Sequence, residues 1–278
     1  MRILISGWRG YISGVLMPRL QELGHTIHLF QGVIEAHRNW NDAPSGYDAV
    51  IHLAAFNDLY GCETAPLKSF YTNYFGTMLA AKYCIENKAK LIFTSTDTVT
   101  GISGMPISVY DSHKWAAEKS LLSLSELDSV TLRLSTVYGP SPAQSKQANR
   151  GIINRWCKMA LAGETLKVYE GVKHCRRDYL HVSDVADAII KAMDAPRGSY
   201  QVCTGIGTSI LDMARLIARE AGAGSKVEVV PEPEKLHTIE YRTGIGDYHL
   251  MNWQTGWQPK LNIINGIAET IKYFGESS

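Results

Sequence analysis

The sequence predicts an α/β fold, in which a doubly wound parallel sheet is joined to a smaller carboxy-terminal lobe. Three observations lead to this fold class. Short apolar strands alternate with helical patterns through the first 140 residues, as in parallel sheets that helices cover on both faces. A glycine-rich turn joins the first strand to the first helix. A near-continuous apolar run at residues 47–55 has the character of a buried central strand.

Composition excludes several classes of function. The chain has 278 residues, of which 45% are hydrophobic and 20% charged, as in ordinary soluble globular proteins. A formal net charge of +1 gives no strong electrostatic attraction to nucleic acid or acidic membranes. No apolar run reaches the roughly 18 residues of a membrane helix, and glycine interrupts the amino terminus too early for a signal peptide. We therefore expect a cytoplasmic protein without nucleic-acid or membrane partners.

The cysteines and histidines indicate neither disulfides nor a metal. The five cysteines are widely spaced and include no C-x-x-C pair, and the nine histidines show no close ligand spacing. Reduced, buried thiols in a cytosolic protein are the expected explanation. The cysteines are Cys62, Cys84, Cys157, Cys175 and Cys203. We predict no metal site.

The first strand, turn and helix have the order of a phosphate-binding unit. Residues 2–6 are an apolar strand, and a helical pattern after the turn ends at Gly24. Gly7 permits the tight turn, and Gly10 lets the backbone approach phosphates at the helix amino terminus. Ser13 stands at the third glycine position and is small enough for close helix–strand packing. The residues expected to contact a dinucleotide here are Gly7, Arg9, Gly10, Tyr11 and Ile12.

The second strand, at residues 25–30, ends in Gln31 rather than in an acidic residue. An acid at this position would bind the ribose 2′-hydroxyl of NAD. Its absence removes the repulsion of a 2′-phosphate, and Arg9, with Arg38 as a second candidate, could supply positive charge. This favours NADP(H) by a small margin. A solvated surface charge is an equal alternative for both arginines.

The next elements continue the alternation of strands and helices. Residues 32–47 leave room only for an abbreviated crossover before the apolar run at 47–55. Small residues at the end of that run suit close passage of a cofactor. A helix is expected over 67–87, followed by a strand at 90–95 that delivers Thr96. The residues expected along the cofactor path are Leu53, Ala54 and Ala55.

Tyr110 and Lys114 are four residues apart on the next predicted helix, which continues to Leu122. They therefore lie one turn from each other on the same side. A phenol is a poor base with a reference pKa of ~10, but a neighbouring ammonium lowers that pKa. A tuned phenol can act as a general acid or base, and Thr96 could join it. Taken alone, the pair is common on helices, where a half-buried Tyr beside a solvated Lys is the ordinary explanation.

Eight segments together resemble the extended short-chain dehydrogenase/reductases, the nucleotide-sugar epimerase/dehydratase/reductase family, also called the NAD-dependent epimerase/dehydratase family. They follow the family order and span nearly the whole chain. The segments are residues 6–13, 48–55, Asn73 with Gly76 and Thr77, 94–101, 110–114, 133–140, 177–186 and 256–259. Jointly they are specific for the family but not for one substrate.

The resemblance implies a Rossmann domain that binds NAD(P)(H) and a lobe that binds a nucleotide-sugar substrate. Thr96, Tyr110 and Lys114 take the places of the catalytic triad, and Lys114 would also hold the nicotinamide ribose. A hydride would pass between the nicotinamide and a sugar carbon, while Tyr110 exchanges the proton on that carbon's oxygen. Asp97, beside Thr96, is expected to contact the substrate. A homodimer is a further expectation.

Departures from the family pattern bear on the reaction. Sugar-nucleotide 4,6-dehydratases carry Asp-Glu after the hydroxyl residue, whereas this chain has Asp97-Thr98. The base next to the 4-keto group is missing from its usual place, which disfavours a dehydratase. The turn at 7–10 resembles NADPH-dependent GDP-fucose synthases, residues 95–97 resemble 4-keto-rhamnose reductases, and residues 177–182 resemble 4-epimerases. Epimerase and ketoreductase therefore stay open.

The carboxy-terminal part is expected to divide between two domains. Residues 1–140 would form the dinucleotide-binding domain, to which 177–205 return, whereas 141–176 and 206–278 would form the substrate lobe. Within these segments we expect short strands at 200–203 and 226–231 and a helix at 208–222. Arg177 and Arg242 are candidates for the substrate diphosphate, because arginine suits phosphate geometry. An ion pair within the lobe is an equal alternative for each.

Two other classes of function compete with an enzyme. A non-catalytic dinucleotide-binding regulator could use the same fold, since fold does not fix function. The intact Thr96, Tyr110 and Lys114 speak against it, because a sensor needs no acid or base. An RNA-binding protein on this fold is disfavoured by the near-zero net charge.

Overall fold

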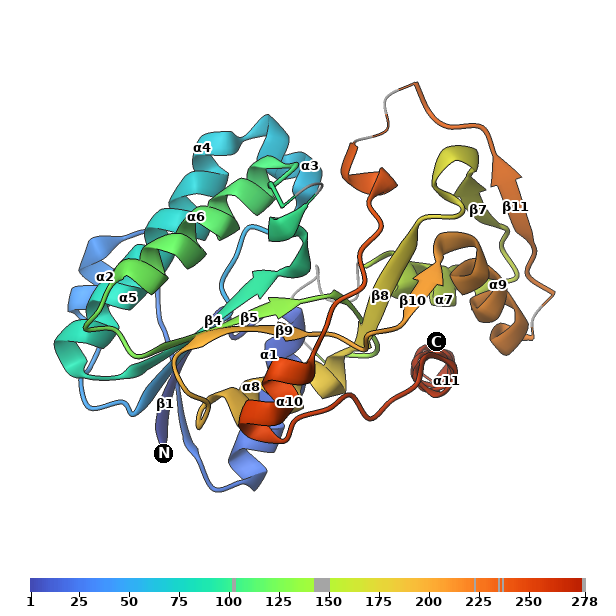
Figure 1. Cartoon of the computed structure of the whole chain (residues 1–278). Helices are drawn as coiled ribbons and strands as arrows, with labels where there is room; N and C mark the ends of the chain where they lie inside the picture. Colours follow the sequence, from blue (N-terminus) through green and yellow to red (C-terminus); the bar gives the residue numbers. More distant parts are fainter. Residues whose placement is uncertain (102–103, 143–150, 223, 235, 237, 277–278) are drawn as a thin grey trace.

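The computed structural model describes residues 1–101, 104–142, 151–222, 224–234, 236 and 238–276. Its centre is a six-stranded parallel sheet with the order β2-β1-β3-β4-β5-β9 (Figure 1). The strands are β1 (Arg2–Ser6), β2 (Thr26–Leu29), β3 (Ala49–His52), β4 (Lys90–Thr96), β5 (Ser129–Leu134) and β9 (Gly198–Val202). The predicted α/β fold class with a parallel sheet is confirmed.

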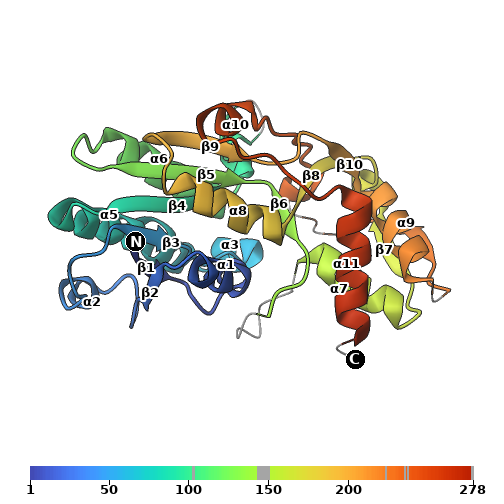
Figure 2. The same cartoon turned by 90° about the horizontal axis from the view of Figure 1, so that it is seen from below.

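Helices cover both faces of this sheet (Figure 2). One face packs against α1 (Tyr11–Glu22), α8 (Val182–Ala192) and α10 (His249–Thr255). The other face packs against α2 (His37–Asn41), α5 (Gly76–Asn87) and α6 (Val109–Ser123). Alternate strand residues supply the two cores, since Ile3 and Ile5 enter the first and Leu4 the second. This double burial explains why the strands are nearly continuous apolar runs.

The crossover between β2 and β3 is short, as predicted, and its helix α2 has five residues. The helix expected over 67–87 is instead three consecutive segments. They are α4 (Pro66–Ser69), the π-helix η1 (Phe70–Phe75) and α5. The short helix α3 (Leu59–Thr64) comes before them. The wider turn of a π-helix is uncommon and often marks a functional region.

The remaining elements form a second layer beside the carboxyl ends of the main sheet (Figure 1). A three-stranded sheet has the order β10-β8-β6, and β7 pairs with β11. The strands are β6 (Thr136–Tyr138), β7 (Leu166–Tyr169), β8 (Arg176–His181), β10 (Gly207–Ser209) and β11 (Val227–Val230). The helices are α7 (Ile152–Leu161), α9 (Ile210–Ala221) and α11 (Ile263–Glu276), with short 3₁₀ turns η2 (Asp97–Thr100), η3 (Glu170–Val172) and η4 (Thr238–Tyr241). They enclose a third core.

The chain crosses more than once between the main sheet and the second layer. β8 pairs with β6 and β10, whereas β9 joins the main sheet and α8 packs on α1. Met251 and Trp257, from the segment expected in the substrate lobe, pack in the first core. The division into a dinucleotide domain and a substrate lobe stays a prediction. Within the described residues, no helix has both the length and the apolar character needed to cross a membrane.

Candidate active site

The glycine turn lies where the strand order of the main sheet reverses. β1 and β3 are neighbours there, and Gly7 and Leu53 follow them directly. Gly7 has a φ of +71°, and a Cβ at this position would lie 2.5 Å from the backbone nitrogen of Ala54. Only glycine fits such a contact. Ligands of open α/β sheets bind at such switch points, and Leu53, Ala54 and Ala55 are partly buried beside it.

Ser13 stands at the position of a third glycine, and its side chain hydrogen-bonds to the backbone of the turn. Its hydroxyl is fully buried and lies 3.2, 2.8 and 2.8 Å from the carbonyl oxygens of Gly7, Trp8 and Gly10. The one hydroxyl hydrogen of Ser13 therefore has three carbonyl acceptors within reach. Gly10 offers no side-chain cap, and the first turn of α1 carries no acidic residue. The first amides of α1 are therefore available to an anion, so the unit fits a pyrophosphate.

Arg9 is held near the end of β2 by stacking on Trp8. The guanidinium carbon lies 4.3 Å from the ring centroid, and Trp8 Nε1 donates to the carbonyl oxygen of Phe30 at 3.2 Å. Gln31 follows directly and is exposed. The structure therefore brings Arg9 and Gln31, predicted for the same end of the cofactor, to the same strand end.

Three other candidates for the cofactor site are engaged elsewhere. Arg38 is exposed on α2, where Nε donates to Asp42 at 3.3 Å. This is the solvated surface charge considered for it. The Tyr11 hydroxyl donates to the carbonyl oxygen of Gly139 at 2.5 Å, which joins the glycine turn to the strand end after β6. Ile12 packs against the first core.

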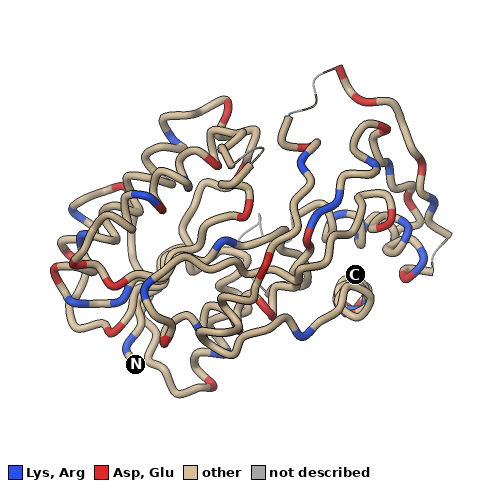
Figure 3. Tube along the Cα trace, in the orientation of Figure 1, with Lys and Arg blue, Asp and Glu red and all other residues tan. Residues whose placement is uncertain are grey.

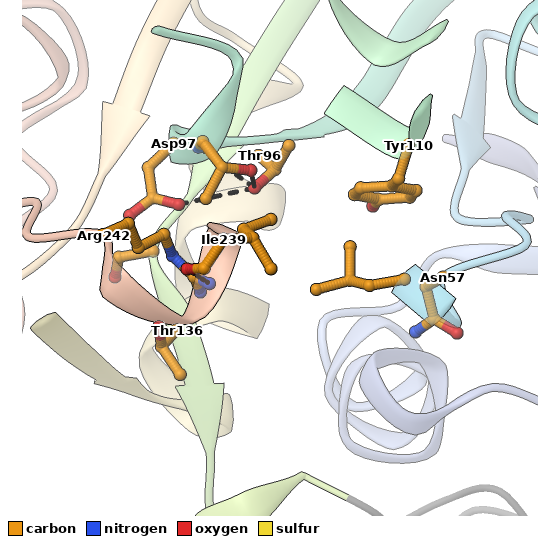
Figure 4. A pocket seen from close by; sticks show the side chains of 10 residues that line it. Asn57, Thr96, Asp97, Tyr110, Thr136, Ile239 and Arg242 are labelled. Carbon is orange, nitrogen blue, oxygen red and sulfur yellow. Dashed lines mark hydrogen bonds between the residues drawn. The ribbon is translucent and has the colours of Figure 1, made fainter. Parts of the chain in front are cut away.

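A cavity of about 180 Å³ lies at the carboxyl ends of β4 and β5. Thr96 and Tyr110 both line it, and Figure 4 shows that they approach it from different elements. The lining residues are Asn57, Leu59, Thr96, Asp97, Thr98, Tyr110, Ser135, Thr136, Ile239 and Arg242. The second layer of the fold contributes Ile239 and Arg242, so the cavity lies between the two layers.

Lys114 lies behind this cavity rather than in its wall. Its side chain is buried, Nζ donates to the carbonyl oxygen of Thr94 at 2.8 Å, and the ammonium stands 4.4 Å from the centroid of the Phe93 ring. Burial lowers the pKa of Lys114 to about 7, against the opposing effect of Glu118. That carboxylate is itself held by Arg133, with Nη2 at 2.6 Å.

The expectation that Lys114 lowers the pKa of Tyr110 is wrong for this structure. Burial raises the pKa of Tyr110 well above its usual value, and the charges of Asp111, Cys62 and Asp97 add to this effect. The reason is geometric, since the amine of Lys114 is turned to the backbone of β4. The raised pKa favours the neutral phenol of Tyr110, which is the form of this side chain that can donate a proton.

A chain of hydroxyl groups leads from Thr96 into the protein. The Oγ1 atoms of Thr96 and Thr98 are 2.7 Å apart, and the backbone N–H of Thr98 donates to Thr96 Oγ1 at 3.2 Å. Thr98 Oγ1 in turn donates to Oδ1 of the fully buried Asp111 through a short hydrogen bond. No local pattern in the sequence points to Asp111, because it is thirteen residues from Thr98.

Asp97 lines the cavity beside Thr96, as Figure 4 shows. Burial raises the pKa of Asp97 to about 6; the charge of Asp178 adds to this, whereas Arg242 opposes it. Arg242 lies across from Asp97 on the second layer, and its guanidinium donates to the carbonyl oxygen of Ile239 at 3.3 Å. The structure therefore brings together Asp97 and Arg242, two of the three predicted substrate residues.

Arg177, the third predicted substrate residue, forms an ion pair within the second layer. Its Nη2 lies 2.8 Å from the Glu240 carboxylate, which is the alternative considered for it. It also lines a smaller cavity of about 50 Å³ that Arg242 and Asp97 share with the first. Arg177 is therefore near the site, but its charge is already balanced.

Asn73 supports the site from the π-helix η1. Its Oδ1 accepts the N–H of Phe56 and its Nδ2 donates to the carbonyl oxygen of the same residue, both at 2.9 Å. This clamp fixes the loop after β3, where Asn57 lines the cavity. In the sequence, Asn73 stands out only as part of the family pattern. In the described part of the chain, no three His, Cys, Asp or Glu side chains converge as metal ligands.

Comparison with known proteins points to one family. The model of the "NAD dependent epimerase/dehydratase family" matches residues 3–203. A UDP-glucose 4-epimerase of Mycolicibacterium smegmatis is 26% identical, over 100% of both chains. A UDP-N-acetyl-alpha-D-glucosaminuronate decarboxylase of Bacillus cytotoxicus is 26% identical over 99% of this chain and 98% of its own. A dTDP-glucose 4,6-dehydratase of Streptomyces niveus is 27% identical over 85% and 73%.

Solved structures share the fold over the whole chain. A UDP-glucose 4-epimerase of Thermotoga maritima with UDP-glucose has a TM-score of 0.89 at 24% identity, covering 100% of this chain and 99% of its own. A UDP-glucose 4-epimerase of Thermus thermophilus with NAD has a TM-score of 0.86 at 24% identity and covers 100% of both chains. RMD from Pseudomonas aeruginosa, complexed with NADPH, has a TM-score of 0.85 at 19% identity, covering 100% and 99%.

Proposed function

The chain belongs to the NAD dependent epimerase/dehydratase family, and on this premise we propose that it is an NAD(P)-dependent nucleotide-sugar epimerase or 4-ketoreductase. One observation carries the proposal: Thr96 and Tyr110 line the same cavity, with Lys114 one helical turn behind Tyr110 on α6. Relatives named as epimerase, decarboxylase and dehydratase support a sugar nucleotide as the substrate and leave the reaction to be chosen from the site.

The residues present fit the dinucleotide. Gly7, Gly10 and the first amides of α1 would hold its pyrophosphate, and Lys114 would reach its nicotinamide ribose by leaving Thr94. When bound, the nicotinamide supplies or accepts a hydride at a sugar carbon. Tyr110 moves the proton at the oxygen of that carbon, and its raised pKa suits the direction in which it donates. Thr96 hydrogen-bonds the same oxygen.

For the cofactor we propose a preference for NADP(H). Gln31 brings no negative charge against a 2′-phosphate, and Arg9 stacked on Trp8 supplies a positive one at the same strand end. Structural neighbours are named with NAD and with NADPH, so the fold accommodates both. The preference therefore rests on these side chains alone.

For the substrate we propose that Arg242 and Asp97 contact the nucleotide sugar. Arg242 would meet the diphosphate and Asp97 a sugar hydroxyl. Arg177 would join only by exchanging Glu240 for phosphate. We also propose that the protein is not a 4,6-dehydratase, because Thr98 lines the cavity where those enzymes carry Glu.

The assembly and the compartment are part of the proposal. Leu67, Tyr71 and Phe75 follow one another every four residues along α4 and η1, and all three are exposed. Such an apolar row supports a homodimer. Figure 3 shows basic and acidic residues interspersed over the described trace, in keeping with a small-molecule substrate rather than nucleic acid or membrane. The five cysteines are free thiols, as the reducing cytoplasm would keep them.

The decisive experiment incubates the purified protein with UDP-glucose and NAD(P)⁺ and, separately, with a 4-keto sugar nucleotide and NAD(P)H, with products resolved by chromatography. UDP-galactose formed without net consumption of cofactor would identify an epimerase. Consumption of NAD(P)H with a 4-keto sugar nucleotide, one cofactor per product, would identify a ketoreductase. Tight dinucleotide binding without turnover of either would favour the alternative, a non-catalytic regulator, for which the bond between Lys114 and Thr94 is the supporting observation.

A further inference from the structure

Asp111 is a buried carboxyl group that the proposed chemistry does not use. It follows Tyr110 on α6 and its side chain is fully buried. One oxygen, Oδ1, accepts the hydrogen of the Thr98 hydroxyl. The other, Oδ2, is buried without a hydrogen-bond partner among the described residues. A buried carboxylate with an unpartnered oxygen costs free energy unless it takes up a proton.

The position of Asp111 first suggests a helix cap, but its side chain makes a different contact. Ser108 is the N-cap of α6, and its hydroxyl accepts the backbone N–H of Asp111 at 3.1 Å. In a full capping box, the acidic side chain three residues after the N-cap, here Asp111, would accept the backbone N–H of the N-cap residue. Here the carboxyl turns to Thr98 instead. Capping therefore leaves the contact between Asp111 and Thr98 unexplained.

We propose that Asp111 is a positioning residue which, through Thr98, sets the direction in which the Thr96 hydroxyl donates its hydrogen. This inference rests on the proposed function, because it concerns the hydroxyl assigned to the substrate oxygen. Each hydroxyl has one hydrogen, so the direction of one bond in the chain fixes the next.

The two charge states of Asp111 give two arrangements of the chain. An ionised Asp111 only accepts, so Thr98 donates to it and Thr96 donates inward to Thr98 across 2.7 Å. Thr96 then offers the cavity a lone pair, which suits a substrate hydroxyl. When Asp111 is protonated on Oδ1, the oxygen that contacts Thr98, it donates to Thr98, which donates to Thr96. Thr96 then turns its hydrogen away from Thr98, either to Asp97 Oδ1 at 3.4 Å or to a substrate carbonyl in the cavity. No proton leaves Asp111 along the chain, since the hydroxyls only rotate.

The groups around Asp111 set its charge state. Burial raises its pKa, and Glu63 from α3 adds to this effect. Thr98, Ser108 and Arg242, the last from the second layer, lower it. The Ser108 hydroxyl, which accepts the backbone N–H of Asp111 at 3.1 Å, is near enough to the carboxyl group to favour its ionised form. The other titratable groups that face Asp111 are Cys62 on α3, Asp97 on η2 and Tyr110 on α6 itself.

The first test uses the free protein and needs no substrate. Infrared difference spectra between neutral and alkaline pH should show a protonated carboxylic-acid band that is lost as pH rises. Asp111→Asn should lack this band, and Asp128→Asn, at an exposed surface carboxylate, should keep it. Thr98→Val should move the band to higher frequency, because the carboxyl loses a hydrogen bond. An unchanged band in Asp111→Asn or in Thr98→Val would overturn the proposal.

The second test compares pH profiles of UDP-glucose turnover. Wild-type activity should change with a midpoint that coincides with loss of the infrared band. Thr98→Val keeps the charge of Asp111 but breaks the hydroxyl chain, so it should lose this midpoint, whereas Thr64→Val on the exposed surface of α3 should keep it. A purely structural role predicts that both Asp111→Asn and Thr98→Val scale activity equally at every pH, which would refute the inference.

The two tests separate the inference from the function on which it rests. If the wild type turns over neither UDP-glucose nor a 4-keto sugar nucleotide with NAD(P)H, the proposed function loses its support, while the infrared comparison still decides whether Asp111 is coupled to Thr98. If turnover is normal but its pH profile survives Thr98→Val, the function stands and the positioning role of Asp111 fails.

Discussion

Lys114 and Thr94 are joined by a hydrogen bond of 2.8 Å from the ammonium nitrogen to a backbone carbonyl oxygen of β4. The same strand carries Thr96 two residues later, so the helix that presents Tyr110 is tied directly to the strand that presents the hydroxyl. Lys114 therefore has a structural task in addition to any cofactor contact, and its substitution should be read in both respects.

Replacing Lys114 with Met should flatten the pH dependence of stability. The folded-state pKa of about 7 lies below the unfolded value, so the unfolded chain binds more protons between about pH 7 and 10 and stability rises with pH in that window. Urea unfolding at several pH values should show this rise in the wild type and not in the variant. Lys82→Met, at an exposed pair with Glu86, should retain it. If the free energy of unfolding of Lys114→Met rose with pH as steeply as that of the wild type, burial would not lower the pKa of Lys114.

Replacing Tyr110 with Phe should abolish most activity while preserving the fold. The ring and its packing stay, but the exchangeable proton is lost, and general acid or base groups contribute about 10²–10⁴-fold. Turnover should fall by at least the lower figure, with melting temperature and dinucleotide affinity little changed. Tyr74→Phe, which removes a hydroxyl bonded to Ser120 at 3.1 Å, is the matched control. Turnover within a few-fold of wild type would rule out Tyr110 as the acid.

Replacing Asp97 with Asn should stabilise the protein and impair its function. The pKa of Asp97 is raised to about 6 in the folded state, above its value in the unfolded chain. The folded protein therefore loses stability as pH rises from about 4 to 6 and the buried carboxyl group becomes charged. The variant should gain about 1–3 kcal/mol of unfolding free energy at pH 7, and this gain should vanish near pH 4. Its KM for the nucleotide sugar should rise. A less stable variant at pH 7 would show that Arg242 outweighs burial.

Replacing Arg9 with Ala should separate the two cofactors. A charge-assisted hydrogen bond to a 2′-phosphate is worth about 1.5–3 kcal/mol, so NADPH affinity should fall roughly tenfold or more while NADH affinity stays the same. Fluorescence titration of both cofactors measures this. Arg38→Ala, at a solvated pair with Asp42, should change neither. A strong NADH preference in the wild type that survives Arg9→Ala would remove the proposed NADP(H) preference.

Incubation with dTDP-glucose should give no 4-keto-6-deoxy product. Thr98 has no basic group to remove the proton beside a 4-keto carbon, and the carboxyl behind it is buried and bonded to Thr98. Absorbance of the 4-keto product in alkali provides the assay. Product at a normal enzymatic rate in the wild type would show that another residue supplies the base.

The sequence predicted the main strands and the glycine turn because their signals are local. A strand buried on both faces must be apolar throughout, and the tight turn at Gly7 requires a positive φ. The π-helix was missed, as was the contact of its residue Asn73 with Phe56, seventeen residues away. A continuous helical pattern over 67–87 does not reveal such a contact.

The chemical state of the site depends on the tertiary structure. The sequence placed Tyr110 and Lys114 one turn apart, but the pKa of each is shifted mainly by burial. Neighbours at one helical turn cannot predict how much protein covers them or which backbone atom the amine reaches. Arg177 shows the same limit, because only the folded chain reveals that Glu240 already balances its charge. The division into domains stays a prediction.

The side chain of Asn154 forms hydrogen bonds both to the glycine-turn unit, at Tyr11, and to the segment after β6, at Gly139. From α7 its side chain accepts the N–H of Gly139 at 3.0 Å and donates to the hydroxyl of Tyr11 at 3.3 Å. Ser141 also donates to the carbonyl oxygen of Tyr11 at 2.7 Å. A ligand that shifts one layer would disturb these bonds to the other, so a dinucleotide and a sugar nucleotide bound on the two sides would be thermodynamically linked. By reciprocity, whatever factor a bound dinucleotide applies to sugar-nucleotide affinity, the sugar nucleotide must apply to dinucleotide affinity.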